Sequence, residues 1–528
     1  MKKQNLITNI VVFIAIIVMI NLVSVSVFKR LDFSKGHVYS LTKASKEAVR
    51  GLEDNLVVKA YFSKNLPGQL ADARRYTEDM LSEYQAYSKG KLRFEFIDPK
   101  DEEGMKEEAR KNQIQPMQVQ SVEKDEMAIR EIYMGLAFLY QDKVESIPAV
   151  QNTAGIEYDF TKIIKKVTSK GMKKIAFFPK EVELPPQMQQ QMMQNPNDNF
   201  TQIRQMLADS YELSTTDLAE ELTSDISTLV FSGTQDSLSD EQLFNLDQYI
   251  VKGGNVLFFQ EKVTADLQQQ SATLINSNLF SMLSSYGINI KDNLVTDALC
   301  GQIQVQRQQG MFRFNTPISY PLFPVINNVN KDNIIVKNLD VLQFLFASEI
   351  DVTRINDNIS FEPLLYSSEN SGQINPPQFD ISIQQFMDKN IKQMLIDSPK
   401  VLSGLYKGIF PSYFANNPMF ANVVPSGMEG KILLVADSDF IKNSGAAGVK
   451  GNLDFVLNSV DYLASESALI EIRSRETEFI PLKDLKPGQK NLIKWLNILF
   501  PSILLVLIGV VNWRKELNKR KLIGEMYE

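Results

Sequence analysis

Cysteine and histidine are almost absent from this sequence, whose 528 residues include one of each, Cys300 and His37. A single cysteine excludes an intramolecular disulfide framework, a CxxC redox pair and a cysteine-rich zinc site. A single histidine excludes histidine-rich metal centres. Catalysis by a thiol with an imidazole base would require these two distant residues to meet. The composition therefore favours a protein that does not use such chemistry.

An excess of positive charge is also missing, since the net charge is -7 and the sequence pI is about 5.3. Nucleic-acid binding needs a basic face or stripe, so we expect no nucleic-acid partner. A G-x-x-x-x-G-K-[ST] loop is absent as well, because "GMEGKI" and "GAAGVKGN" lack its spacing and hydroxyl. We therefore expect that the chain does not hydrolyse nucleotide itself.

Two long uncharged apolar runs lie near the ends of the chain. Leu6–Phe28 has 23 residues, enough to cross a bilayer core that needs about 20 helical residues. A cleavable signal peptide would have a shorter apolar core and an A-x-A-like site, which Ser24 and Ser26 imitate only weakly, so we favour an uncleaved anchor. The second run, Trp495–Trp513, is bracketed by the only two tryptophans. A helix would place them about 27 Å apart, the spacing of two interfacial belts, which favours a membrane helix over a buried core helix.

The flanking charges predict the orientation. After Trp513 the chain continues with a short basic tail, which should remain in the cytoplasm. Basic residues also lie between the two runs, after the first and before the second, and these oppose this orientation. We nevertheless expect both termini to be cytoplasmic and residues from about 31 to 490 to be exported. The tail residues are Arg514, Lys515, Lys519, Arg520 and Lys521, and the opposing residues are Lys29, Arg30, Lys486, Lys490 and Lys494.

The first part of the exported region, residues 31–170, alternates strands and helices. We expect strands at 56–62 and 92–98, helices at 69–87 and 101–113, and a hairpin of "IREIYMGLAFLY" and "DKVESIPAV" joined at Gln141-Asp142. A helix over 158–168 follows. This order resembles a thioredoxin-like domain. The redox dithiol is missing, because "FSKNLPG" after the first strand has no cysteine, so the scaffold should serve binding or structure.

A second alternation begins at Lys174 and extends over residues 171–475. "KIAFF", "ISTLVFSG" and "NVLFF" predict strands separated by helices, and Ser239 to Gln242 fits a capping box. "KILLVADSDFI" and the helix "NLDFVLNSVDYLAS" restore the pattern much later. A mainly parallel sheet is implied. The layout resembles a glutamine-amidotransferase-like, flavodoxin-type α/β fold with a long insertion at about 262–428, followed by a linker over 476–494.

The residues that such an enzyme needs are not in place. Cys300 lies in "NLVTDALCGQ", which is not a strand-to-helix elbow, and His37 is close to the first apolar run. Asp437 and Asp439 in "VADSDF" could hold a cation at a strand end, although aspartates there more often close a turn or cap a helix. A Gln/Met/Asn-rich stretch, 184–199, is typical of a mobile loop rather than a methionine copper site. We expect no cofactor and no metal.

Several blocks together resemble the ABC-transporter auxiliary proteins, including the gliding-motility-associated GldG proteins of Bacteroidetes. They are "RLDFSKGHVYSLTKAS", "VVKAYFSKNLP", "GGNVLFF", "LYKGIFPSYF", "VADSDF", "FVLNSVDYLA" and "IEIRSRE". The resemblance runs in order through nearly the whole chain. It implies a periplasm-facing subunit of the bacterial inner membrane that works with a separate ATPase and an ABC-type permease, is often called substrate-binding, and has an obscure ligand. It carries over no catalytic residues.

The segment after the first apolar run is interpreted as a stiff exit from the membrane rather than a loose linker. Lys29 and Arg30 can lie at the interface, and Thr42 can cap a helix whose apolar side packs on a core. Candidate partner-contacting residues are Arg30, Asp32, Tyr39, Ser40 and Leu41, and the candidate membrane anchors are Trp495 and Trp513.

Two function classes remain after these exclusions. The favoured one is a non-enzymatic accessory or ligand-binding subunit of a membrane transport or motility machine, in contact with permease, ATPase and lipid. The alternative is a membrane-anchored envelope enzyme or redox protein. The residue inventory favours the first, because thiols, imidazoles and a nucleophile motif are lacking. Binding of a solute and a mechanical or scaffold role are not separated by the sequence.

Overall fold

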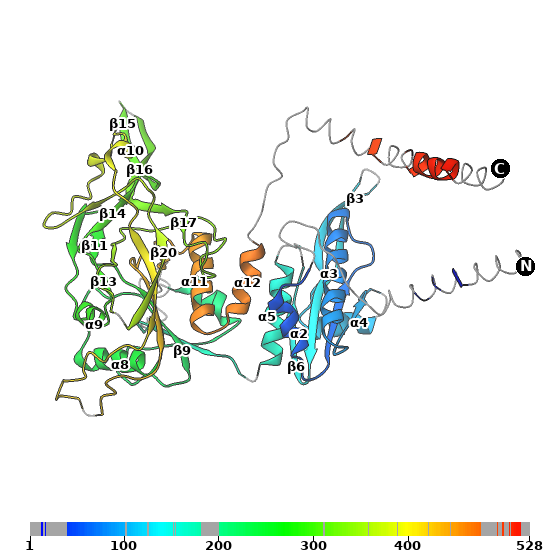
Figure 1. The fold of residues 1–528 in the computed structure, drawn as a ribbon, viewed down its shortest axis with the longest axis horizontal. Coiled ribbons are helices and arrows are strands. Elements are labelled where there is room, and N and C mark those ends of the chain that lie inside the picture. The colour runs from blue at the N-terminus through cyan, green and yellow to red at the C-terminus, as the bar shows by residue number, and fades with distance from the viewer. Residues whose placement is uncertain are drawn as a thin grey trace, which may run out of the picture. The chain divides into compact units, whose positions relative to one another are not determined.

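The computed structural model describes residues 40–100, 103–123, 126–150, 155–169, 171–180, 200–309, 312–356, 358–387, 389–420, 422–443, 445–476 and 508–518. It also describes the single residues 12, 13, 16, 19, 153, 494, 499, 500 and 506. The chain forms two compact units, Met1–Glu478 and Phe479–Glu528, and each is considered by itself (Figure 1).

The first sheet of the larger unit has four strands in the order β2-β1-β5-β6. β1 pairs parallel with β2 and antiparallel with β5, which also pairs antiparallel with β6. One face packs against α2, α3 and α5 through a cluster that includes Val58, Leu81 and Phe160. The elements are α2 (Lys43–Arg50), β1 (Leu56–Phe62), α3 (Gly68–Tyr87), β2 (Leu92–Ile97), α4 (Glu103–Lys111), β5 (Met134–Tyr140), β6 (Lys143–Ile147) and α5 (Ile156–Thr168).

These elements confirm the predicted helices, the predicted strands at 56–62 and 92–98 and the hairpin turn at Gln141-Asp142, whereas the name thioredoxin-like stays a prediction. The single strand expected over 129–140 is wrong. It consists of β4 (Glu126–Ile132), which pairs with β3 (Met117–Glu123), and of β5, which pairs with β1 and β6. The change of partner occurs at Tyr133, whose backbone exchanges two hydrogen bonds of 3.0 Å with the backbone N–H and the hydroxyl of Ser63.

The second sheet has eight strands in the order β17-β20-β22-β23-β10-β9-β7-β8. The five strands from β23 to β8 run parallel to one another, and β22, β20 and β17 continue the sheet in antiparallel pairing. The return of the chain to this sheet after a long insertion, which the sequence predicts, is confirmed by β23. The strands are β7 (Lys174–Phe178), β8 (Glu212–Thr215), β9 (Ile226–Phe231), β10 (Asn255–Phe259), β17 (Asn328–Val329), β20 (Ile359–Tyr366), β22 (Val401–Gly408) and β23 (Gly430–Val435).

Helices cover both faces of this sheet (Figure 1). Alternate residues of the strands face opposite sides, so that Phe177 and Leu257 pack with α7 (Thr201–Ala208) and α11 (Lys450–Leu463). Their neighbours Phe231 and Phe258 pack with α8 (Asp240–Val251) and α9 (Leu279–Ser285). The runs of apolar residues in the sequence follow from this burial on both faces.

The expected capping box begins α8. Ser239 accepts a hydrogen bond from the Gln242 backbone, while the Gln242 side chain accepts one from the Ser239 backbone. The helix ends before Gly253, whose φ of +91° lies in the left-handed region that glycine adopts without a steric penalty. The same side-chain capping begins α2, where Thr42 accepts a hydrogen bond from the Ser45 N–H at 3.2 Å. Both caps are confirmed predictions.

The insertion between β10 and β23 forms small antiparallel sheets around an apolar core of its own, which includes Val263, Tyr320 and Phe386. It also supplies the three antiparallel strands that extend the main sheet. Its other elements are β11 (Val263–Asp266), β12 (Ser271–Leu274), β13 (Asn289–Ile290), β14 (Leu294–Asp297), β15 (Cys300–Gln309), β16 (Phe312–Ile326), β18 (Leu342–Gln343), β19 (Ile350–Asp351), β21 (Ser371–Ile374), η1 (Ile383–Gln385) and α10 (Ile391–Met394).

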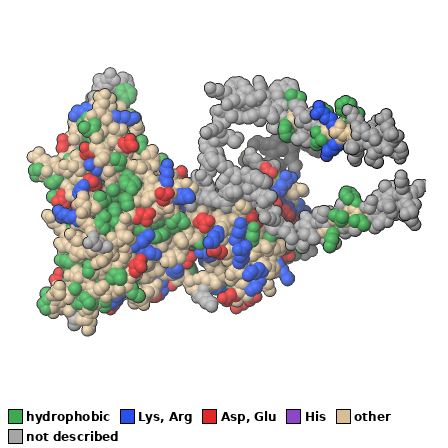
Figure 2. All heavy atoms as spheres, in the orientation of Figure 1, with side chains coloured by type: hydrophobic (Ala, Val, Ile, Leu, Met, Phe, Trp, Pro, Cys, Tyr) green, Lys and Arg blue, Asp and Glu red, His purple; other side chains and the backbone are tan. Residues whose placement is uncertain are grey.

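The last helix of the larger unit, α12 (Ser467–Glu476), follows α11 directly. In the smaller unit, residues 508–518 are helical. Most of the two predicted membrane runs lies outside the described residues. Among the residues that are described, no helix has both the length and the apolar character needed to cross a membrane. Figure 2 shows side chains of both charges over the visible face of the molecule.

Candidate functional site

Asp437 and Asp439 lie where the sequence predicts them, beyond the carboxyl end of β23. The Asp437 carboxylate accepts hydrogen bonds from the Asp439 and Phe440 N–H groups at 2.8 and 3.2 Å. Its second oxygen accepts a hydrogen bond from Leu345 N–H at 2.7 Å. Asp437 therefore closes the turn after the strand, as the alternative interpretation of the sequence proposes.

Two more charged side chains, Glu261 and Lys442, complete an acidic cluster with Asp437 and Asp439. Glu261 follows β10 and accepts a hydrogen bond from Ser438 N–H at 2.7 Å. Lys442 Nζ lies 2.7 Å from Asp439 Oδ1. In the part of the chain that the structure describes, no three His, Cys, Asp or Glu residues are grouped so that they could hold a metal ion.

Burial dominates the electrostatics of the acidic cluster. It raises the pKa of Asp437 well above the usual range, and the charge of Asp439 adds to the effect. It also raises the pKa of Glu261, against the opposing charge of Lys442. For Lys442 burial works against the charged form, but the carboxylates of Asp439 and Glu261 raise its pKa nonetheless. Asp437 and Glu261 therefore hold their protons more tightly than exposed carboxyl groups do.

The insertion covers the cluster. Ser348 N–H donates to the Ala436 carbonyl at 3.0 Å, and Lys262 N–H donates to the Ser348 hydroxyl at 3.1 Å. Together with the bond from Leu345 to Asp437, these contacts lay residues 344–348 across the carboxyl ends of β10 and β23. Open α/β sheets bind ligands at this edge. Here the edge is occupied by the chain itself.

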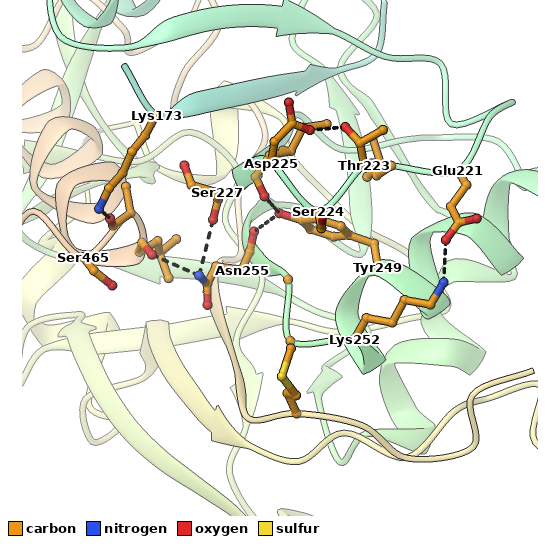
Figure 3. Close-up of a pocket in the computed structure, with 17 residues that line it drawn as sticks. Lys173, Glu221, Thr223, Ser224, Asp225, Ser227, Tyr249, Lys252, Asn255 and Ser465 are labelled. Carbon is orange, nitrogen blue, oxygen red and sulfur yellow. Dashed lines mark hydrogen bonds and ion pairs between the residues drawn. The ribbon is translucent and has the colours of Figure 1, made fainter. Parts of the chain in front are cut away.

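The opposite edge of the sheet carries a cavity of about 850 Å³ (Figure 3). It lies where β9 and β10 begin, and the chain around it includes the loop before β9, the end of α8 and the end of α11. Its apolar lining includes Leu222, Ile226, Met428 and Leu463. This volume is in the range of small-molecule sites, about 300–1,000 Å³.

Several of the polar side chains of this cavity bond to the protein. Asn255 donates to the Ser227 and Leu463 carbonyls at 3.3 and 3.0 Å and accepts from Lys431 N–H at 3.1 Å. Lys252 forms an ion pair with Glu221 (Figure 3). The cavity therefore offers shape and apolar surface, and the side chains of Asn255 and Lys252 are already bonded to other residues of the chain.

The structure places some of the predicted site residues and leaves others outside the described residues. Arg30, Asp32, Tyr39, His37 and Trp495 belong to the second group. Ser40 and Leu41 are described, and Leu41 is buried in the core cluster of the first sheet, with its N–H donating to Glu83 at 3.0 Å. Trp513 is described as a helical, exposed residue of the smaller unit.

Cys300 begins β15 and is half-buried. Burial raises the pKa of its thiol to about 11, and the charge of Asp297 adds to this. The thiol is therefore protonated at neutral pH, which is the opposite of what a nucleophilic cysteine requires.

Sequence reasoning missed a junction at which α12 packs against α2 and α5. At its centre lies Arg473, whose side chain is 11% exposed and donates to Asp461 at 3.0 Å and to the Tyr158 hydroxyl at 2.8 Å. Tyr211 donates to the other oxygen of Asp461 at 2.7 Å. The one available signal was Arg473, which lies near the end of the segment "ALIEIRS", four of whose seven residues are apolar.

A second buried carboxylate, Glu157 on α5, joins α2 to this junction. One of its oxygens accepts hydrogen bonds from Thr42 N–H at 2.7 Å and from the Ser45 hydroxyl at 2.6 Å. The Ser45 hydroxyl also lies 2.8 Å from that of Thr161. The first turn of α2 is thus fixed to α5 by polar bonds inside the protein.

Comparison with known proteins gives the following matches. The model of a family described as an ABC-type uncharacterized transport system matches residues 172–459, and a domain of unknown function matches residues 35–139. An uncharacterized protein of Borreliella burgdorferi is 23% identical over 535 residues, which cover 98% of this chain and 99% of that protein.

Among solved structures, the mmIFT52 N-terminal domain aligns with a TM-score of 0.31 and 11% identity over 55% of this chain and 96% of that chain. A putative ThuA-like protein from Parabacteroides merdae gives a TM-score of 0.27 and 11% identity over 56% and 91%. Scores this low assign no fold.

Proposed function

The chain belongs to the family described as an ABC-type uncharacterized transport system, and from this membership we propose a non-enzymatic, membrane-anchored subunit of an ABC transporter complex. It works with a separate permease and a separate ATPase, and most of it faces the periplasm. Its primary role in this proposal is that of a scaffold that couples two membrane segments.

The junction of α2, α5 and α12 is the observation that carries the scaffold role. In the sequence, α2 follows the first predicted membrane run, and α12 precedes the linker to the second. The two helices pack against each other and against α5. Buried polar bonds of Arg473 and Glu157 hold them there. A displacement of either membrane segment would therefore be transmitted to the same packed group of helices, α2, α5 and α12.

The covered carboxyl edge of the main sheet supports a non-enzymatic role. Residues 344–348 lie where a substrate of an α/β enzyme would enter, and the Asp437 oxygens are used by backbone N–H groups. The raised pKa of the Cys300 thiol, which keeps it protonated at neutral pH, also supports this role.

Two narrower statements belong to the same proposal. We assign a flavodoxin-type, amidotransferase-like arrangement to residues 171–475, supported by the strand order β8-β7-β9-β10-β23, which in chain order reads 2-1-3-4-5. A thioredoxin-like arrangement is assigned to residues 31–170. Association with gliding motility rests on the sequence blocks that resemble GldG.

A second candidate function is solute binding, which the cavity of about 850 Å³ at the amino ends of β9 and β10 favours. A solute there would be held mainly by shape and apolar contact, because several of the polar side chains around it, such as those of Asn255 and Lys252, are bonded to the chain. Substituting Leu222 by Trp fills this cavity. It should abolish a solute-binding function and leave a scaffold function intact.

Co-purification tests the proposal. The tagged full chain is extracted from its native membrane in a mild detergent, and the proteins that elute with it are identified by mass spectrometry. We expect an ABC-type permease and an ATPase. Replacing Asp32 and Tyr39 by alanine should reduce their recovery without changing membrane insertion. A chain that elutes alone, and that works with its second apolar run replaced by an unrelated one, contradicts the proposal.

A further inference from the structure

A second cavity, of about 680 Å³, opens between the end of β1 and the start of α3. Four cationic side chains line it, and one carboxylate, that of Glu78, accompanies them. We propose that this cavity binds a phosphate-bearing ligand, an assignment that goes beyond the proposed scaffold role and does not depend on it. The cations are Lys64, Arg74, Arg75 and Arg130.

Among the described residues that line the cavity, the cationic side chains outnumber the carboxylates, so the lining has an excess of formal positive charge. Arg75 is exposed, and within the described residues its side chain makes no hydrogen bond or ion pair. Arg74 donates to the Ser63 carbonyl at 3.4 Å and lies 5.3 Å from the centre of the Phe96 ring. Both of these partners are uncharged, so they position the guanidinium without cancelling its charge.

The start of α3 adds to the positive electrostatic potential of the cavity. This helix has 20 residues, begins after Pro67 without a side-chain cap, and has no acidic residue in its first turn. The positive end of its dipole is therefore left uncompensated beside the cations. A multiply charged anion would relieve the repulsion among these groups.

The residue types select phosphate within the class of anions. The planar guanidinium fork of arginine matches two oxygens of a phosphate group, and a helix start offers N–H groups to a third. Lysine adds a point charge. The phosphate could belong to a free solute or to a lipid headgroup, and both present the same chemistry to the cavity.

The test uses the full chain in nonionic detergent micelles. Sodium phosphate is titrated against sodium chloride of matched ionic strength, and binding is followed by calorimetry and by the thermal unfolding midpoint. We expect saturable binding of phosphate. The double variant Arg75→Gln/Arg130→Gln should bind at least about tenfold more weakly, since two charge-assisted hydrogen bonds are lost.

Two single variants sharpen the test. Glu78→Gln removes the one carboxylate among the described residues that line the cavity and should tighten phosphate binding about threefold or more. Arg93→Gln removes an exposed cation on β2 outside the cavity and should leave binding within about twofold of the wild type. If the double variant fails to fold, Arg75→Gln alone, on an exposed side chain, still decides the outcome.

Short-chain phosphatidylglycerol added to the micelles distinguishes the two sources. Competition with inorganic phosphate identifies a lipid headgroup as the ligand, whereas the absence of competition identifies a free solute, and both results support a phosphate site. Phosphate binding that does not exceed the chloride control overturns the proposal. So does equal binding by the double variant, or binding of a tetraglutamate peptide without binding of phosphate.

Discussion

At the scale of single residues, Cys300 gives a test between a non-enzymatic transport subunit and an envelope enzyme or redox protein. Its thiol, with a pKa raised to about 11, is protonated at neutral pH. We predict that Cys300→Ser retains function and partner recovery, because the residue serves only as the first residue of β15. Complementation of a deletion strain measures this. Loss of function in a variant with an unchanged unfolding midpoint would revive the enzyme alternative.

The buried acids Glu261 and Asp437 predict how the free energy of unfolding depends on pH. Their folded-state pKa values are raised, chiefly by burial, so the folded protein binds these protons more tightly than the unfolded chain does. The free energy of unfolding should therefore fall as pH rises from about 4, the unfolded pKa, through the raised folded values. Glu261→Gln keeps an oxygen for Ser438 N–H and removes one titration, so it should flatten this fall.

Thermal unfolding of the full chain between about pH 4 and pH 8 measures the effect. Glu220→Gln, on an exposed side chain, is the matched control and should follow the wild-type curve. A slope for Glu261→Gln as steep as that of the wild type would show that burial does not control this carboxyl group.

At the scale of elements, the junction around α12 should be among the most sensitive places in the protein. Arg473→Ala leaves Asp461 buried without its cation, which should cost about 3–5 kcal/mol of unfolding free energy. Lys252→Ala breaks the exposed pair with Glu221 and should cost about 0–1 kcal/mol. Urea unfolding of the full chain compares the two, and similar losses would contradict the central role of Arg473.

The attachment of α2 gives a second prediction for an element. Glu157→Ala removes the acceptor for Thr42 N–H and the Ser45 hydroxyl, so the first turn of α2 should lose about 1.5–3 kcal/mol of local stability per bond to a charged acceptor. Amide hydrogen exchange should show faster exchange in α2 and unchanged exchange in α8, which has its own capping box. Uniformly faster exchange in both helices would instead indicate global destabilisation.

At the scale of the whole molecule, the central prediction concerns topology. Reporters fused after Glu528 and within exposed loops of the larger unit should report a cytoplasmic C-terminus and an exported region from about 31 to 490, because the tail is basic and both apolar runs have spanning length. A periplasmic C-terminus, or a mature protein that begins near Val27, would overturn this topology and the membrane-coupling role with it.

The sequence by itself determined the elements whose causes are local. The capping box at Ser239, the cap at Thr42, the glycine stop after α8 and the alternating strands of the main sheet depend on residues a few positions apart, and all were predictable from their spacing. The turn-closing interpretation of Asp437 was available for the same reason. The division between β4 and β5 at Tyr133 could not be predicted in this way, because it depends on Ser63, 70 positions away.

The tertiary structure alone decided the features on which the function is argued. Leu345 reaches Asp437 across 92 positions and closes the carboxyl edge, and Arg473 reaches Tyr158 across 315 positions and joins α12 to α5. The cationic cavity likewise combines the loop after β1 with Arg130 on β4. Such pairs cannot be predicted from periodicity or motifs, because the packing of apolar faces determines which distant polar groups come together. Once buried, these groups must form hydrogen bonds with one another in place of water.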